Sequence, residues 1–509
     1  MKKYIVYHPL LFAIYPILFF YTYLHNMDVI LFFDEVVGPL VVSSGLSLIF
    51  LLILKPIFGN IYKAALFLSI FLSIFFLNGH VFLVAQDLTG RLIGIQRYIY
   101  LIWFISLFSC FLLIKRHKGD LIKLTSYLNL VSFLLVVIPI IKIATHNVIV
   151  WNIHHHFIGD DISQNSILLT NDSPEELPDI YYLIPDRYIS PYLLSSIFGY
   201  NNGEMIQYLH DKDFYIASGS LCNYPSTSLS LTSSLNMQYL PELAQDPGKD
   251  TFDYSLVFTL FRNNKVSRLL KSIGYRYIHI AGQYSLIKKD RYLDELIYYR
   301  NQSRFKQLLI EYSLVGPVID KFFRDEHGSR GLHRKALLYE FDKLEEIVLK
   351  EGPKFVFAHI PCPHYPYVFK QNCEMLTTGE RRRFEEKEAY LNQLICTNKQ
   401  LRTIVDQILA KSTTDPIIII QSDEGEIFNE VKSMETRRAM KTQIINAYHL
   451  PNNGDRMLYD SISPVNTFRI IFNYYFGADF TILEDKCYGY TRTRNEKAVK
   501  LVDLDDWEF

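Results

Sequence analysis

Hydrophobic residues are concentrated in the first 150 positions, where long apolar runs alternate with short polar segments. Crossing a bilayer takes about 20 mostly apolar residues. Five runs approach or exceed this length, and they lie near residues 9–25, 37–58, 62–85, 97–114 and 121–143. The first run is short, but it lacks a small-residue cleavage site, so we interpret it as a retained span and not a signal peptide. The pattern predicts a membrane domain of about five transmembrane helices over residues 1–150.

Basic residues mark one side of these apolar runs. They precede the first run and fill the loops after the second and fourth runs, at Lys2, Lys3, Lys55, Lys63, Lys115, Arg116, Lys118 and Lys123. The positive-inside rule places such loops in the cytoplasm. An odd number of spans then puts everything after about residue 150 on the extracytoplasmic side of the plasma (inner) membrane. Four or six spans would reverse that orientation.

The rest of the chain has the pattern of an α/β domain over residues 175–509. Apolar, β-prone runs occur at 180–185, 276–280, 354–359 and 416–421, with helical periodicity between them. Alternating strands and helices predict a mostly parallel central sheet covered on both sides. Residues 151–174 are polar and predict a linker, in which the histidines at 154–156 are more typical of a linker than of a metal site.

Carboxylates follow two of the predicted strands. Between Pro416 and Glu426, a run of four isoleucines is followed by Asp423 and Glu424. The apolar run at 180–185 is followed by Asp186. Ligands of open α/β sheets bind beyond the carboxyl ends of the strands, and hard cations take oxygen ligands. These acids therefore indicate a metal site, although a strand ending in a polar turn gives the same pattern.

A third element lies between the two acid-bearing runs. Residues 223–236 read N-Y-P-S-T-S-L-S-L-T-S-S-L-N, and Ser226 or Thr227 is suited to cap a helix that starts near Ser228. A plain N-cap explains the residue types. The functional alternative is a hydroxyl nucleophile at the positive end of a helix, where phosphate or sulfate is favoured.

Charge and cysteine content add limits. The net charge of -1 gives no basic field for nucleic acid. Cysteine is sparse, and no C-x-x-C pair indicates structural zinc. Cys362 with Cys373 is a possible disulfide in the outer domain, although spacing does not establish the pairing.

The motifs resemble a known family when they are taken in order. The segments D-I-Y-Y-L-I-P-D, N-Y-P-S-T-S-L-S, F-V-F-A-H-I-P-C-P-H-Y-P and I-I-I-I-Q-S-D-E-G-E follow the order found in sulfatase-like membrane proteins of the alkaline phosphatase superfamily. The chain is similar to lipoteichoic acid synthases and phosphoethanolamine transferases, which also carry about five spans before an outer catalytic domain. The resemblance covers roughly residues 175–490 and the membrane layout.

The resemblance implies a set of site residues. Asp186 matches the first metal-binding acid, Asp423 the late metal aspartate, and Thr227 the threonine that contacts the metal and becomes transiently modified. Glu424 stands where the family usually has histidine, and His364 lies where relatives place a histidine near the substrate anion. With Glu424 as a ligand the metal site would be all-oxygen, which favours Mn²⁺ or Mg²⁺ over Zn²⁺ or Ca²⁺ as the cofactor.

Three further residues give weaker indications of a role in the site. His359 is expected to pack at a strand end and His449 to lie in a surface loop, with a place near the metal as the alternative for each. Arg187 is as consistent with an anion clamp as with a plain surface arginine.

The implied function is a metal-dependent transferase. It would move a phospho-substituent, of phosphoethanolamine or phosphoglycerol type, from a membrane phospholipid donor to an envelope glycan or lipid acceptor through a covalent intermediate on Thr227. A sulfatase or phosphodiesterase is one alternative, but the C/S-x-P-x-R pattern of sulfatases is absent around Thr227. The replacement at Glu424 also fits a non-catalytic, glycan-binding protein that has kept the fold.

Overall fold

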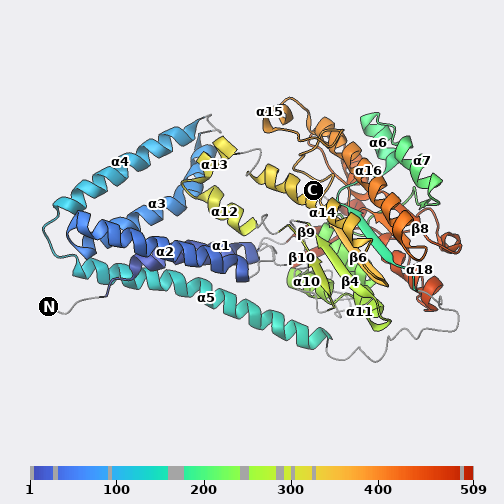
Figure 1. Ribbon diagram of the computed structural model, residues 1–509, viewed down its shortest axis with the longest axis horizontal. Helices are drawn as coiled ribbons and strands as arrows, with labels where there is room; N and C mark the ends of the chain where they lie inside the picture. The colour runs from blue at the N-terminus through green and yellow to red at the C-terminus, as the bar shows by residue number, and fades with distance from the viewer. Residues whose placement is uncertain are drawn as a thin grey trace. The chain divides into compact units, whose positions relative to one another are not determined.

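A computed structural model describes most of the chain. It covers residues 5–26, 33–89, 94–158, 177–240, 251–282, 292–299, 304–323, 328–492 and 498–507. The chain divides into two compact units, which are described separately. The first unit comprises residues 1–151 together with 301–329, and the second comprises 152–300 and 330–509 (Figure 1).

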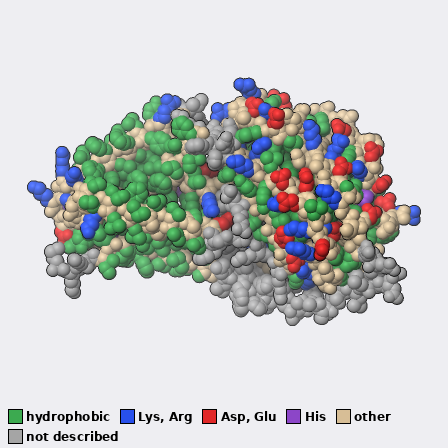
Figure 2. All heavy atoms as spheres, in the orientation of Figure 1, with side chains coloured by type: hydrophobic (Ala, Val, Ile, Leu, Met, Phe, Trp, Pro, Cys, Tyr) green, Lys and Arg blue, Asp and Glu red, His purple; other side chains and the backbone are tan. Residues whose placement is uncertain are grey.

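Long apolar helices build the first unit, and every predicted span falls within one of them, except that the fifth span starts one residue before its helix. They are α1 (His8–Asn26), α2 (Phe33–Phe58), α3 (Ile61–Leu88), α4 (Ile95–Arg116) and α5 (Ile122–Ile158). Among the described residues, four of these helices are long and apolar enough to cross a membrane, while the apolar part of α1, His8–Leu24, is shorter. Hydrophobic side chains dominate the visible surface of this unit (Figure 2). The protein is therefore a multi-pass membrane protein.

Two boundaries in the chain differ from the pattern expected of the sequence. Helix α5 continues to Ile158, so the histidines at 154–156 belong to a helix, and residues 159–174 of the predicted linker lie outside the described residues. Residues 301–329 belong to the membrane unit although they lie far along the chain. Two short helices form there, α12 (Arg304–Tyr312) and α13 (Gly316–Phe323).

A seven-stranded sheet forms the centre of the second unit, in the order β2-β8-β7-β1-β6-β4-β5. The strands are β1 (Ile180–Pro185), β2 (Tyr215–Ile216), β4 (Arg276–Ala281), β5 (Glu295–Ile297), β6 (Lys354–Ile360), β7 (Ile417–Gln421) and β8 (Asn446–His449). Pairing is parallel from β7 through β5, whereas β8 is antiparallel to both of its neighbours. The predicted membrane domain and mostly parallel α/β sheet are thus confirmed, and all four predicted strands are present.

Helices cover both faces of this sheet. One face packs on α7 (Gly203–Asp211), α14 (Ser329–Ile347) and α16 (Glu386–Lys411). The other packs on α8 (Thr227–Asn236), α10 (Tyr254–Arg262), α11 (Lys265–Ser272) and α18 (Pro464–Phe476). The four isoleucines of β7 are fully buried, and they alternate between the two cores as expected for a strand covered on both sides.

Smaller elements complete the second unit. A three-stranded antiparallel sheet joins β3 (Thr251–Asp253), β10 (Ala498–Asp503) and β9 (Tyr488–Arg492). The remaining α-helices are α6 (Pro191–Phe198), α15 (Thr378–Arg381) and α17 (Met434–Thr442).

The cysteine pairing differs from the possibility raised by the sequence. A disulfide joins Cys373 to Cys396, with a Cα–Cα distance of 5.0 Å that suits a bridge. Cys362 is a buried free thiol, 3.0 Å from the hydroxyl of Thr397. The possible Cys362–Cys373 bridge is therefore wrong, because the nearer partner of Cys373 comes from helix α16.

Candidate metal centre and nucleophile

Three side chains meet at the carboxyl ends of β1, β6 and β7. Strand register aligns Ile184 with His359, and the chain reaches Asp186 two residues later. The two oxygens of Asp186 and Asp423 that face the imidazole lie 3.6 Å and 3.7 Å from His359 Nε2. One ligand atom from each of the three side chains falls within 4.8 Å of the others, and all three residues are buried. Parallel strands thus bring two acids and a histidine to one point of the sheet edge.

The polar atoms of this group lack ordinary partners. His359 Nε2, Asp186 Oδ1 and both carboxylate oxygens of Asp423 are buried with no hydrogen-bond partner. Buried polar atoms are nearly always paired, so each exception calls for an explanation, and a bound ion is one. Two carboxylates and one imidazole fit the donor set of a divalent metal that keeps an open position. We conclude that Asp186, His359 and Asp423 form a possible buried metal site.

Electrostatics without a metal shows how strongly the three groups interact. Burial opposes charge on His359, but Asp423 and Asp186 outweigh it and raise its pKa to about 9. Burial also works against charge on Asp423, yet His359 and Thr227 lower its pKa to about 2. Burial and the neighbouring Asp423 charge raise the pKa of Asp186 well above its usual range. Binding of a divalent cation to these side chains would release the proton that His359 carries.

Thr227 is the first residue of helix α8, and Ser226 occupies the N-cap position. The Ser226 hydroxyl makes no capping bond and lies 3.3 Å from the Ser228 hydroxyl. The Thr227 side chain lies near Asp423, since it is among the groups that lower the pKa of that carboxylate. The structure therefore brings the predicted nucleophile to the predicted metal-binding acid at a helix N-terminus.

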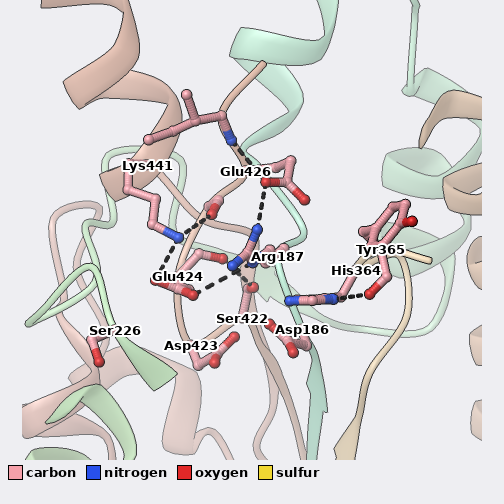
Figure 3. A network of polar contacts seen from close by, with 12 residues as sticks. Asp186, Arg187, Ser226, His364, Tyr365, Ser422, Asp423, Glu424, Glu426 and Lys441 are labelled. Carbon is pink, nitrogen blue, oxygen red and sulfur yellow. Dashed lines mark hydrogen bonds and ion pairs between the residues drawn. The ribbon is translucent and has the colours of Figure 1, made fainter. Parts of the chain in front are cut away.

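Glu424 lies beside this group but is not one of its three members. Its carboxylate forms ion pairs with two cations, at 2.6 Å to Lys441 Nζ and 3.5 Å to Arg187 Nε (Figure 3). Arg187 also donates to Glu426 at 2.7 Å. Gly425 allows this arrangement, because a Cβ there would lie 1.9 Å from the carbonyl oxygen of Met440, next to Lys441.

Arg187 is therefore not a plain surface residue. Its backbone has a positive φ of 64°, and its side chain points back between the two glutamates (Figure 3). Glu424 and Glu426 are almost fully buried, so the four charges form a neutral, largely dehydrated network next to the metal group.

His364 reaches the same region from the loop after β6 (Figure 3). Its ring Nδ1 contacts the backbone oxygen of Tyr365. Burial holds the pKa of His364 well below its usual range, and the positive charges of Arg187 and Lys441 lower it further. The imidazole is therefore neutral near pH 7, and its Nε2 points toward Asp186 (Figure 3).

Two other histidines show what the sequence pattern missed. His359 was expected to pack at a strand end, and that expectation is wrong, because it completes the buried group with Asp186 and Asp423. It lies one residue before the end of β6, beside the acid-bearing strand β1, and the local sequence does not show which strands are neighbours. His449 lies in β8 and not in a surface loop, and its ring contacts Lys212 and Asp415.

Comparisons with known proteins yield solved structures alone. No family model matches the chain, and no curated protein matches it. The C-terminal periplasmic domain of EptC from Escherichia coli is 14% identical, covers 68% of this chain and 98% of its own, and has a TM-score of 0.46. A second structure of that domain is a complex with zinc.

Two further structures extend the likeness. The integral membrane lipooligosaccharide phosphoethanolamine transferase A from Neisseria meningitidis is 12% identical, with a TM-score of 0.39, and covers 87% of this chain and 88% of its own. BT1596, a 2-O GAG sulfatase, is 10% identical, with a TM-score of 0.37, and covers 65% of this chain and 86% of its own. In fold, the chain is similar to the sulfatase-like domains of phosphoethanolamine transferases, preceded by apolar membrane helices.

Proposed function

We propose that this protein is a membrane-bound, metal-dependent transferase that uses Thr227 as a covalent nucleophile. The observation that carries the proposal is the position of Thr227 at the N-terminus of α8, against the buried group of Asp186, His359 and Asp423. A helix N-terminus favours an anionic group, and unpartnered acids beside a hydroxyl suit phosphoryl chemistry. The donor is a membrane phospholipid, and the acceptor is a hydroxyl of an envelope glycan or lipid.

A divalent cation held by Asp186, His359 and Asp423 would supply Lewis-acid stabilisation of the phosphorus-bound oxygens. Because one of the three ligands is an imidazole, the all-oxygen argument for Mg²⁺ does not apply to them. Mixed carboxylate and imidazole donors suit Zn²⁺ or Mn²⁺ better than Mg²⁺ or Ca²⁺. We therefore propose Zn²⁺ or Mn²⁺ as the cofactor.

The reaction has two displacements. Thr227 Oγ forms a bond to phosphorus while the bond from phosphorus to the lipid's glycerol oxygen breaks, and the hydroxyl proton ends on that leaving oxygen. The acceptor hydroxyl then attacks the threonine phosphodiester, and Thr227 regains a proton from the acceptor. If water replaces the acceptor, the same chemistry makes the protein a phosphodiesterase-type hydrolase.

Glu424 has a positioning role in this proposal. Because its carboxylate holds Lys441 and contacts Arg187, it fixes two cations beside the metal group. These cations, together with an N–H donated by neutral His364, would surround the phosphate oxygens. Glu424 would then influence turnover without holding the metal itself.

The test is a mass measurement on the full-length protein. Purified protein is incubated with native membrane lipids and Mn²⁺ or Zn²⁺, and its intact mass is compared with that of Thr227→Ala and of Ser226→Ala. We expect an adduct in the wild type and in Ser226→Ala, which keeps the nucleophile, but none in Thr227→Ala. The mass of the adduct identifies the transferred group. Absence of an adduct in the metal-loaded wild type, or an adduct that persists in Thr227→Ala, contradicts the proposal.

A further inference from the structure

Residues 301–329 return to the membrane unit from a distant part of the chain, so the second unit is joined to it at three places along the sequence. Helix α12 buries Phe305 and Leu308 against Ile17, Phe20 and Leu24 of α1. These α1 residues lie toward the end of the helix at Asn26, which is the end farthest along the chain from the N-terminus. The insert thus packs beside one end of the membrane helices.

The depth of the insert follows from its contacts with α3 and α4. Gln96, at the start of α4, donates to Asn78 at 3.3 Å, so Asn78 is level with that end of α4. Tyr100, about 6 Å further along α4, donates its hydroxyl to Leu314 O at 2.9 Å. Since α4 has 22 residues, close to the length of one bilayer crossing, the turn between α12 and α13 lies near the membrane surface, within the first turns of the span.

Backbone polar groups of this turn form hydrogen bonds with α3, as the apolar environment of a membrane requires. Ser313 O accepts from Asn78 Nδ2 at 3.3 Å, and Leu314 N donates to Phe75 O at 3.0 Å. Irregular backbone at membrane depth persists only where protein groups pair with it. Such pairing would be unnecessary for a loop in water.

Close packing on α3 fixes the insert in place. A Cβ at Gly79 would lie 2.5 Å from the Cα of Tyr312, so the turn rests directly on the backbone of α3. The Tyr312 ring also packs on His80, with centroids 4.6 Å apart. Small residues allow this kind of close approach between membrane helices.

Helix α13 then exposes apolar side chains on the outside of the unit. Val318 is 47% exposed and Phe322 is 68% exposed, and their spacing of four residues puts them on one side of the helix. Val315, which precedes the helix, is 43% exposed. Lys306 and Glu311 of α12 are exposed as well. Charged side chains at this depth fit the polar headgroup region of the bilayer.

We propose that α12 and α13 form an interfacial membrane element that contacts the phospholipids of the leaflet on this side of the bilayer. Its turn sits at the boundary between headgroups and acyl chains, and Val318 and Phe322 face the acyl chains. The element gives the chain a contact with the lipid surface apart from helices α1–α5. It requires only that α3 and α4 cross a bilayer, and it does not depend on catalysis by Thr227.

The test uses nitroxide labels on the full chain in nanodiscs of phosphatidylethanolamine and phosphatidylglycerol. Labels are placed at Val318→Cys and Phe322→Cys in a background with Cys110→Ala and Cys487→Ser. A control label goes on Tyr192→Cys, on exposed α6 of the second unit. We expect the ratio of collisions with oxygen to collisions with a water-soluble nickel chelate to be several-fold higher at 318 and 322 than at 192. A ratio like that of the control means exposure to water and overturns the proposal.

Protection of both labels from oxygen and nickel alike would mean that another protein, such as a second copy, covers α13, and this outcome also overturns the proposal.

A second pair of variants tests the packing of the insert on α3. Gly79→Leu should lower the oxygen-to-nickel ratio of the label at 318, whereas Gly45→Leu should leave it unchanged, because a Cβ at Gly45 meets nothing within 4 Å. No effect of Gly79→Leu contradicts the packing on α3.

Discussion

Lys441 Nζ lies 2.6 Å from Glu424 Oε2, and both side chains are at least nine-tenths buried. Removing one partner of a buried ion pair leaves the other charge dehydrated and uncompensated, which costs roughly 3–5 kcal/mol. We expect Glu424→Ala to lower the free energy of unfolding by about 3 kcal/mol, because Lys441 keeps its bond to Gly425 O. Glu424→Gln combined with Lys441→Met should restore most of that stability.

The matched control for this pair is Glu484→Ala. Glu484 pairs with Lys486 at 2.7 Å, but its side chain is 77% exposed, so its loss should cost less than about 1 kcal/mol. Denaturant unfolding of the second unit, followed by tryptophan fluorescence, measures both effects. Equal free energies of unfolding for Glu424→Ala and Glu484→Ala would show that the buried ion pair contributes no more to stability than the exposed one.

Metal binding should depend on pH. A cation can bind His359 only after its proton leaves, and the two acids raise the pKa of this imidazole to about 9 in the metal-free site. As pH rises from 6 to 8, the apparent Kd for Zn²⁺ or Mn²⁺ should therefore fall at least about tenfold per pH unit. Titration of metal-free protein at pH 6, 7 and 8, with a competing chelator for zinc, measures the slope. A pH-independent Kd would argue against His359 as a ligand.

Glu340 on α14 should make the protein less stable at alkaline pH. Both of its carboxylate oxygens are buried without a hydrogen-bond partner, and burial raises its pKa from 4.5 to about 8. Its raised pKa means that the folded state keeps a proton that the unfolded state releases above pH 4.5. Stability is therefore highest below that value and falls as pH rises toward 8.

We expect Glu340→Gln to remove this slope and to gain about 3 kcal/mol at pH 8, with little change at pH 4.5. Glu346→Gln is the control on the same helix, since the Glu346 side chain is 60% exposed. Thermal unfolding across pH 4.5 to 8 makes the comparison. A Glu340→Gln profile parallel to that of the wild type would contradict a buried, protonated Glu340.

His364 should contribute through a neutral N–H and not through a charged imidazolium. Its pKa lies well below the usual range because of burial and the charges of Arg187 and Lys441. Removing one preorganised donor from such a site costs about 10²-fold in rate, so His364→Ala should slow formation of the Thr227 adduct by about that factor. His364→Gln, which keeps an N–H, should recover part of the rate. A wild-type rate in His364→Ala would exclude the role.

Much of the fold was predictable from local pattern. Four apolar runs ending at residues 185, 280, 359 and 421 indicated strands, and the structure has a strand at each of them. Parallel strands then bring Asp186 and Asp423 together at one edge, as their positions after buried runs suggested. These features depend on residues that are close together in the chain, so they can be predicted from one sequence.

Other features depend on contacts that sequence spacing does not encode. The order β7-β1-β6 places His359 on the strand next to that of Asp186 and two strands from that of Asp423, and nothing in the local sequence of β6 reveals its neighbours. Glu424 follows Asp423 directly, but the turn at Gly425 sends its side chain to Lys441, which lies 17 residues later. The disulfide partner of Cys373 and the return of residues 301–329 to the membrane unit are long-range contacts of the same kind.

The most direct test of the account is the metal content of purified full-length protein, measured by elemental analysis. Wild type is compared with His359→Ala and Glu424→Gln, after loading with equimolar Zn²⁺ and Mn²⁺ and removal of free metal. We predict bound Zn²⁺ or Mn²⁺ in the wild type and in Glu424→Gln, and its loss in His359→Ala. Loss in Glu424→Gln with retention in His359→Ala would contradict a centre built from Asp186, His359 and Asp423.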